Sequence, residues 1–226
     1  MSRSSAIFVA GAGTEIGKTY VTAALTRRLR DAGRAVHTLK PLASGVPALG
    51  DPGFAESDTA RLLAAQGLPV TSATVAACSP WRFAAPLSPD LAAAREGRSL
   101  ALCDLVGWCR AEIAATPPGA TLLIEGVGGL MSPVTPEATG LDWLEALGLP
   151  ALLVSGSYLG AISHALTAIE TLRAHGVPLL GIVVCESPKA PTPPETVAAA
   201  IVRHGGTPAH VIARDGACPE TLADLL

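Results

Sequence analysis

The chain has 226 residues, of which 49% are hydrophobic and 15% are charged, and its formal net charge is -3. This length predicts one large domain with a buried core, spanning residues 1–226. The weakly acidic balance, without a run of Lys or Arg, argues against a nucleic-acid partner. No apolar run approaches the roughly 20 residues that a membrane helix requires, so we expect no membrane partner.

The spacing of the cysteines and the first residues of the chain exclude further classes. None of the five cysteines forms a Cys-x-x-Cys pair with another, so neither a zinc site nor a redox pair is indicated. Residues Met1–Ser5 lead directly into the first predicted strand, which leaves no room for a secretory signal. We therefore expect a cytoplasmic protein.

The first predicted element is a strand, Ile7–Ala10, followed directly by the glycine-rich segment Gly11–Thr19, which reads Gly-Ala-Gly-Thr-Glu-Ile-Gly-Lys-Thr. Such a loop can hold a nucleoside triphosphate, because its backbone N–H groups surround the phosphates, Lys18 reaches the terminal ones and the Thr19 hydroxyl can ligate Mg²⁺. The positive end of the helix that follows points at the same phosphates. Five residues separate Gly11 from Gly-Lys-Thr, where the commonest pattern has four. The loop still has the small residues, the lysine and the hydroxyl that phosphate binding requires.

The rest of the chain alternates between buried-strand and helix patterns. The further predicted strands are continuous apolar runs: Val36–Leu39, Leu122–Ile124, Ala151–Val154, Leu179–Val184 and His210–Ala213. The predicted helices are Lys18–Ala32, Asp58–Gln66, Leu100–Ala115 and His164–His175. Two segments, Ala43–Glu56 and Cys78–Pro89, are predicted to be long loops that take part in binding. This order predicts a single α/β domain of the P-loop NTPase type, with a mostly parallel sheet and helices on both faces.

Ligands of such sheets bind beyond the carboxyl ends of the strands, where Gly11, Lys40, Glu125 and Ser155 fall. Glu125 ends a buried strand and precedes glycines, which favours a metal or phosphate site over a solvated loop carboxylate. Lys40 ends a strand that we expect to neighbour the phosphate loop. A second cation there would stabilise charge in phosphoryl transfer, although a lone lysine at a strand end is usually solvated.

Two further candidates are ambiguous from local sequence. Asp58 follows Ser57 at a predicted helix start, where an aspartate serves equally well as a cap or as a metal ligand. His164 has no nucleophile or orienting acid that the sequence pairs with it, so a structural role is favoured over that of a catalytic base.

With these features in place, the chain resembles the dethiobiotin synthetases over nearly its whole length. The resemblance rests on sequence blocks that occur in order: Gly11–Thr19, Lys40–Gly45 (Lys-Pro-Leu-Ala-Ser-Gly), Ser57–Asp58, Phe83–Pro89, Glu125–Gly129, Asp142–Trp143 and Leu159–His164. The Thr-Glu inside the phosphate loop and the Lys-Pro-x-Ala-Ser-Gly block are specific together, because a generic P-loop ATPase is not expected to show both.

The resemblance implies a reaction of biotin biosynthesis. The family is a ligase that forms carbon–nitrogen bonds, closing a ureido ring on 7,8-diaminononanoate with carbon dioxide and MgATP to give dethiobiotin, ADP and phosphate. One amine captures carbon dioxide as a carbamate, and ATP converts the carbamate into a carbamic–phosphoric anhydride. The second amine then attacks this anhydride and expels phosphate.

The resemblance also implies site residues. Lys18 and Lys40 would flank the carbamate and the transferring phosphate as the catalytic residues. The remaining positions are implied by the same blocks: Glu15, Ile16, Gly17, Lys18, Thr19, Tyr20, Asp58, Glu125, Gly126, Val127, Gly128 and Cys185 for ATP; Thr14, Glu15, Ser44 and Ser163 for the diamine; Thr19, Asp58 and Glu125 for Mg²⁺. The family is typically a homodimer, in which the segment Leu159–Ser163 would contact the substrate carboxylate across the interface.

The chain departs from the family's pattern at two of these positions. Cys185 stands where the family often has an asparagine that recognises adenine, and a thiol lacks the paired donor and acceptor of an amide. Ser163 also replaces an asparagine, so the carboxylate contact there is expected to be shorter or water-mediated.

Two other function classes are less consistent with the sequence. A ParA/MinD-like nucleotide-dependent switch shares the general fold, but such proteins usually carry a second lysine early in the phosphate loop, where this chain has Ala12 and Gly13. A cobyrinate-amidating relative would require an additional glutaminase domain, which 226 residues do not accommodate.

Overall fold

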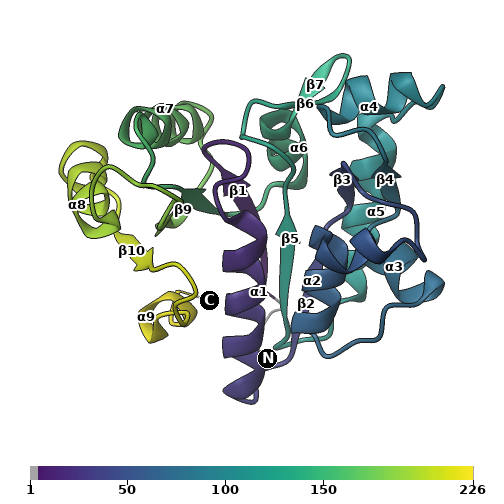
Figure 1. Cartoon of the computed structure of the whole chain (residues 1–226), viewed down its shortest axis with the longest axis horizontal. Coiled ribbons are helices and arrows are strands. Elements are labelled where there is room, and N and C mark those ends of the chain that lie inside the picture. Colours follow the sequence, from purple (N-terminus) through teal and green to yellow (C-terminus); the bar gives the residue numbers. More distant parts are fainter. Residues whose placement is uncertain (1–4, 226) are drawn as a thin grey trace.

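The computed structural model describes residues 5–225, and it is built on a six-stranded sheet (Figure 1). The strands are β1 (Ser5–Gly11), β2 (Val36–Leu39), β5 (Thr121–Glu125), β8 (Ala151–Ser155), β9 (Leu179–Cys185) and β10 (Ala209–Ile212). Their order is β10-β9-β8-β1-β5-β2, and every neighbouring pair is parallel. The predicted α/β fold with a parallel sheet is thus confirmed. The residues before position 5, on which the expected absence of a secretory signal rests, lie outside the described part.

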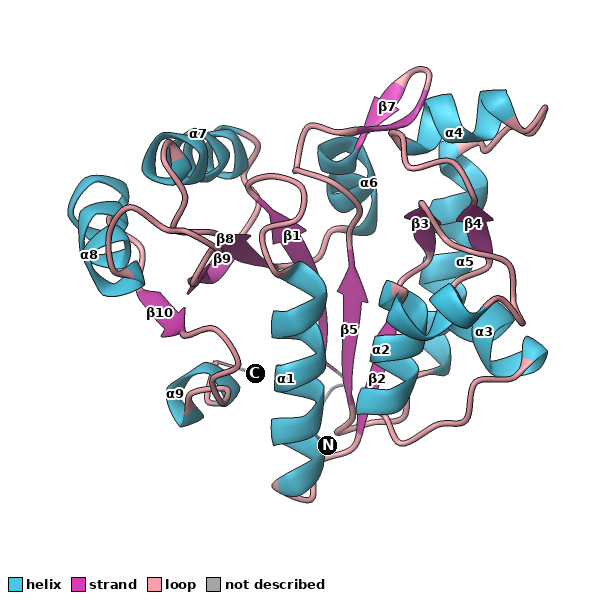
Figure 2. Cartoon of the chain, viewed as in Figure 1, coloured by secondary structure: helices cyan, strands magenta, loops and turns pink. Residues whose placement is uncertain are grey.

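Helices cover both faces of this sheet (Figure 2). The longer helices are α1 (Lys18–Asp31), α5 (Leu102–Ala115), α7 (Ala161–Ala174) and α8 (Pro194–Gly205). The shorter ones are α2 (Asp58–Ala65), α3 (Ser72–Cys78), α4 (Pro89–Arg95), α6 (Gly140–Leu147), α9 (Glu220–Ala223) and the 3₁₀ helix Pro52–Glu56. The helix predicted at His164–His175 therefore begins three residues earlier, directly after Gly160, whose φ is 99°.

Successive side chains of β1 pack alternately into two hydrophobic cores, one on each side of the sheet. Ile7 and Val9 pack in the core formed with α1 and α9, while Phe8 packs in the larger core formed with α5, α6, α7 and α8. Phe8 meets the fully buried Trp143 of α6 edge-on, with ring centroids 4.9 Å apart. Because both faces are covered, the strand is apolar along its whole length, which explains why it was recognisable in the sequence.

The two predicted long loops were partly wrong. Ala43–Glu56 begins within strand β3 (Leu42–Ser44) and ends in the 3₁₀ helix, and Cys78–Pro89 contains strand β4 (Trp81–Phe83). These two short strands pair in parallel as a separate small sheet. A second small sheet joins β6 (Pro133–Thr135) to β7 (Ala138–Thr139) in antiparallel fashion. Such strands are too short to show the periodicity on which the prediction depended.

The expected position of Lys40 next to the phosphate-loop strand was also wrong. β5 lies between β1 and β2 in the sheet, so the strand before Lys40 pairs with β5 and not with β1. The carboxyl ends of all three strands nevertheless lie at the same edge, as parallel pairing requires. No helix among residues 5–225 is long and apolar enough to cross a membrane.

Candidate active site

The phosphate loop connects β1 to the first turn of α1. Gly17 caps α1 with a φ of 97°, a left-handed backbone conformation that side chains disfavour. A Cβ atom at this position would also lie 2.9 Å from Cys185 Sγ, so the loop leaves no space for a larger residue. The loop is therefore held in shape by steric requirements that only glycine meets here.

Lys18 is buried within this loop, and its Nζ donates a hydrogen bond to the Gly13 carbonyl over 2.9 Å. Burial and, to a lesser extent, the nearby charge of Lys40 lower the pKa of Lys18 to about 8, although Glu125 and Asp58 oppose this shift. The ammonium group is thus held inside the loop, where a terminal phosphate would meet it.

Lys40 directly follows β2 and lies at the centre of a polar network that joins the end of β5 to the start of α2. Its Nζ lies 2.6 Å from Glu125 Oε1, 3.0 Å from Asp58 Oδ2 and 3.0 Å from the Gly126 carbonyl oxygen. Burial alone would lower the pKa of Lys40, but the two carboxylates outweigh it and raise the pKa above the usual lysine value. The side chain is 3% exposed, so this lysine is a fixed internal cation and not a solvated one.

Glu125 joins Lys40 to the phosphate loop, because its Oε1 also accepts a hydrogen bond of 2.7 Å from the Thr19 hydroxyl. Asp58 completes the group from the first turn of α2. Burial alone would raise the pKa of Asp58, but Lys40 and the Thr19 hydroxyl hold it below the usual value. The cap of α2 is Ser57, whose Oγ accepts from Ala60 N over 3.2 Å, and the Asp58 side chain is turned to Lys40 instead.

The predicted magnesium ligands can be tested against this geometry. Glu125 Oε2 is buried and has no hydrogen-bond partner, so this carboxylate oxygen is available as a ligand, while Oε1 of the same side chain bonds Thr19. No group of three or more His, Cys, Asp or Glu side chains suited to a metal occurs among residues 5–225. One hydroxyl and two carboxylates suit Mg²⁺, which prefers oxygen ligands, keeps several waters and takes the others from substrate phosphates.

Two adjoining cavities surround these residues. The first encloses about 580 Å³ and is lined by the phosphate loop, Lys40, Ser44, Asp58 and the segment Pro86–Pro89. The second encloses about 340 Å³ between the phosphate loop, the end of β9 and the segment 212–215. The two cavities share five lining residues: Glu15, Ile16, Gly17, Tyr20 and Arg61. The two cavities therefore adjoin along these residues, and we refer to them together as the channel.

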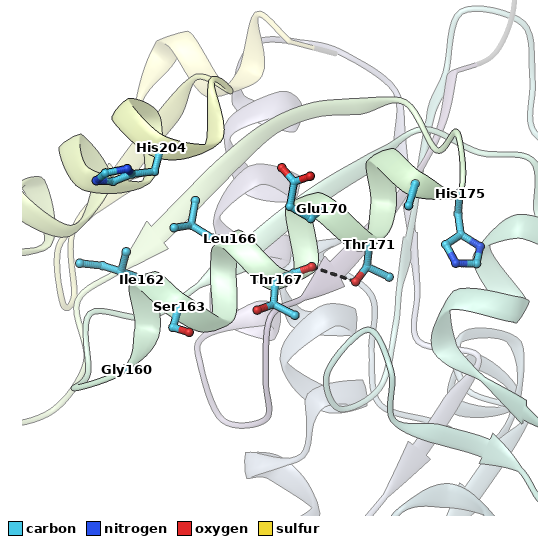
Figure 3. Close-up of a pocket in the computed structure, with 10 residues that line it drawn as sticks. Gly160, Ile162, Ser163, Leu166, Thr167, Glu170, Thr171, His175 and His204 are labelled. Carbon is cyan, nitrogen blue, oxygen red and sulfur yellow. Dashed lines mark hydrogen bonds between the residues drawn. The ribbon is translucent and has the colours of Figure 1, made fainter.

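Most of the sequence-predicted site residues lie along this channel. The first cavity is lined by Thr14, Glu15, Ile16, Gly17, Lys18, Thr19, Tyr20, Lys40, Ser44, Asp58, Val127 and Gly128. Cys185 lines the second cavity, while Glu125 and Gly126 accept hydrogen bonds from Lys40. Ser163 is not brought to these residues. It lies on α7 in a separate surface groove, beside Leu166 and Thr167 (Figure 3).

Sequence reasoning missed three polar residues around the loop. Ser132 lines the first cavity, and its Oγ accepts a hydrogen bond of 2.8 Å from Gly129 N. Tyr158 bonds His164 over 2.7 Å in a third cavity that reaches Gly13 and Thr14. Arg61 lines both cavities of the channel, and its spacing of three residues from Asp58 on a helix was the one available signal. Ser132 and Tyr158 bond Gly129 and His164, and no helical spacing in the sequence marks either pair.

Comparisons with known proteins agree with the geometry. A family model described as an AAA domain matches residues 5–214. The ATP-dependent dethiobiotin synthetase BioD of Methylobacterium nodulans is 71% identical over 98% of this chain and 99% of its own length. The protein of the same name from Acidiphilium cryptum is 44% identical over 93% of each chain.

Among solved structures, a ParA family ATPase from Chlorobium tepidum matches with a TM-score of 0.54 at 12% identity. The match covers 97% of this chain and 87% of the ATPase. At such low identity the likeness concerns the fold alone, and it agrees with the P-loop arrangement of strands and helices.

Proposed function

The chain belongs to the ATP-dependent dethiobiotin synthetase family, and we propose that it closes a ureido ring on 7,8-diaminononanoate with carbon dioxide and ATP. The observation that carries this proposal is the position of Lys40. The ammonium group of Lys40 is held by two carboxylates, and Lys40 lines the first cavity together with the phosphate loop, Ser44 and Thr14. A second substrate placed there would meet the terminal phosphate of ATP.

The reaction has three steps in which atoms and charge balance. An amine of the diamine adds to carbon dioxide and loses a proton, which gives a carbamate. A carbamate oxygen attacks the γ-phosphorus of ATP, and ADP leaves. The second amine then attacks the carbonyl carbon of the mixed anhydride, losing a proton as phosphate departs and the ring closes.

The residues of the channel suit these three reaction steps. A carbamate is a weak nucleophile, so catalysis depends on holding it in line with the γ-phosphate and on neutralising negative charge. Lys18 and Lys40 supply positive charge to the carbamate and to the transferring phosphoryl group. Ser44 and Thr14 offer hydroxyls that orient the diamine, and Glu15 lies near its amines.

Thr19, Asp58 and Glu125 would hold a magnesium ion, as the unpartnered Glu125 Oε2 supports. Bound there, the ion would neutralise charge on the β- and γ-phosphates of the nucleotide. The nucleotide itself would lie along Glu15–Tyr20 and Gly126–Gly128, and its base would reach the second cavity at Cys185.

The direct test is product formation. Protein, diamine, bicarbonate and MgATP are mixed, and dethiobiotin is sought by mass. Phosphate release that the diamine does not stimulate, without a ring product, would contradict the proposal. In the same assay Lys40→Ala is expected to remove most turnover, a loss of roughly 10²–10³ in kcat, while the affinity for ATP stays nearly unchanged. An equal loss of ATP binding would contradict the assigned role of Lys40.

We further propose that the protein is a homodimer in the cytoplasm. The groove along α7 supports the homodimer, because the groove combines Ser163 with the apolar residues Ile162 and Leu166 (Figure 3). Leu159, two residues before this helix, is 89% exposed. The substitution Leu166→Glu is expected to shift the protein from dimer to monomer in size-exclusion chromatography with light scattering. A wild-type monomer at micromolar concentration would contradict the proposal.

A nucleotide-dependent switch of the ParA type is supported only by the fold. The phosphate loop has Ala12 and Gly13 where those proteins usually carry an additional lysine. We therefore do not propose it as a second function.

A further inference from the structure

Arg61 lies on α2, three residues after Asp58 and therefore on the same face of the helix. Asp58 contacts Lys40 at the lysine end of the channel. Arg61 lies one turn farther along, and it lines both the first and the second cavity. The side chain therefore stands at the junction between the two parts of the proposed nucleotide site.

The charges of the channel are distributed unevenly. Lys18 and Lys40 both lie at the end where the terminal phosphate would sit, close to the carboxylates Glu125 and Asp58. Among the described residues that line the junction shared by the two cavities, Arg61 is the one cation. A bound triphosphate would extend its inner phosphates into this junction, where positive charge is otherwise supplied by backbone N–H groups.

The present partner of Arg61 is easily exchanged. Its Nη2 bonds Glu56 Oε2 over 2.6 Å, but the two side chains are 53% and 77% exposed. Such exposed ion pairs contribute little to stability, typically less than about 1 kcal/mol. A phosphate can therefore replace or share this partner at little cost, and the planar guanidinium is suited to two parallel hydrogen bonds with phosphate oxygens.

We propose that Arg61 binds the inner phosphates of the nucleotide and so positions the triphosphate for transfer. This inference rests on the proposed nucleotide site and adds to it a residue that none of the sequence blocks includes. Arg61 acts on binding and orientation, while Lys18 and Lys40 act on the transferring group.

The test compares the dissociation constants of ADP, AMP and adenosine by calorimetry for the wild type and Arg61→Ala. We expect about tenfold weaker binding of ADP, which corresponds to one charge-assisted hydrogen bond, and no change for adenosine, which has no phosphate. In turnover, KM for ATP should rise by about the same factor, with kcat within about threefold of the wild type. Arg61→Lys should recover part of the affinity, because it keeps the charge but loses the planar fork.

Two control variants separate this contact from more general effects. Arg27→Ala removes the same charge from an exposed position on α1 that lines neither cavity, although Arg27 is near enough to influence the pKa of Tyr20. Glu56→Gln releases Arg61 from its present partner and should leave ADP binding unchanged or tighter.

The inference is overturned if Arg61→Ala binds ADP within twofold of the wild type, if adenosine is weakened as much as ADP, or if Arg27→Ala has the same effect. These outcomes leave the proposed function intact as long as the wild type binds ADP. A wild type that binds no nucleotide would overturn both the proposed function and the inference.

Discussion

The buried pair of Lys40 and Glu125 leads to a quantitative prediction for the substitution Lys40→Met. The side chains are 3% and 0% exposed, so the substitution leaves a carboxylate inside the protein with the Thr19 hydroxyl as its remaining hydrogen-bond donor. Breaking a buried ion pair in this way typically costs about 3–5 kcal/mol of unfolding free energy. For a chain of this size, each kcal/mol lowers the melting temperature by about 2–4 °C, so we expect a decrease of roughly 6–20 °C.

The assay is urea denaturation followed by circular dichroism, with a thermal melt as a second measure, in buffer containing EDTA. The double variant Lys40→Met with Glu125→Gln removes both charges, and replacing a whole buried pair is often nearly neutral. It should therefore regain most of the lost stability. The exposed pair of Arg61 and Glu56 provides the matched control, since Arg61→Met should cost less than about 1 kcal/mol.

Two results would refute this reasoning. One is a cost for Lys40→Met no larger than that of Arg61→Met, which would mean that the Glu125 carboxylate does not depend on its lysine. The other is a double variant whose loss equals the sum of the single losses, because contacting charges must show a coupling energy. Added Mg²⁺ should raise the melting temperature of Lys40→Met more than that of the wild type, since the ion would bring positive charge to the same carboxylates.

Two further predictions concern the core and the end of the channel. Trp143→Ala, which empties a fully buried site against Phe8, should lower the unfolding free energy by about 3–5 kcal/mol, as measured by urea denaturation; a loss below 1 kcal/mol would contradict the core assignment. Burial raises the pKa of Cys185 to about 12, so at pH 8 this thiol stays almost entirely protonated and reacts slowly. Iodoacetamide should therefore modify the exposed Cys103 much faster than Cys185, as followed by mass spectrometry, and ATP should protect Cys185 further; equal rates at the two thiols would disprove this environment.

Much of the fold was predictable because its determinants are local. The inner strands of the main sheet are covered on both faces and are mostly apolar, and the phosphate loop directly follows β1, one of them. The small sheet of β3 and β4 was not predictable in this way. Its strands have three residues each and are paired across a separation of about 40 residues, so neither periodicity nor turn chemistry marks them.

The strand order was equally inaccessible. A strand that follows a crossover helix can lie next to the preceding strand or farther along the sheet, and the local pattern is the same in both cases. The expectation that Lys40 follows a neighbour of β1 failed for this reason, since β5 intervenes. The sequence identifies the site residues only as separate candidates, without the contacts between them. Their roles stay predictions. Their contacts, such as Lys40 with Glu125 over 85 positions, required the structure.

The position of β5 explains how a lysine two strands away takes part in the site. Glu125 ends this intervening strand, and its Oε1 accepts hydrogen bonds from both Thr19 on α1 and Lys40 beyond β2. One oxygen atom thus couples the first turn of the phosphate-loop helix to the cation proposed for the second substrate. The ParA family ATPase has a similar arrangement of strands, but a fold does not specify which side chains line its edge. In this chain the proposed ring closure depends on Lys40 and Ser44 lining the same cavity as the phosphate loop with its Thr14, and Glu125 bonds residues on both sides of that site.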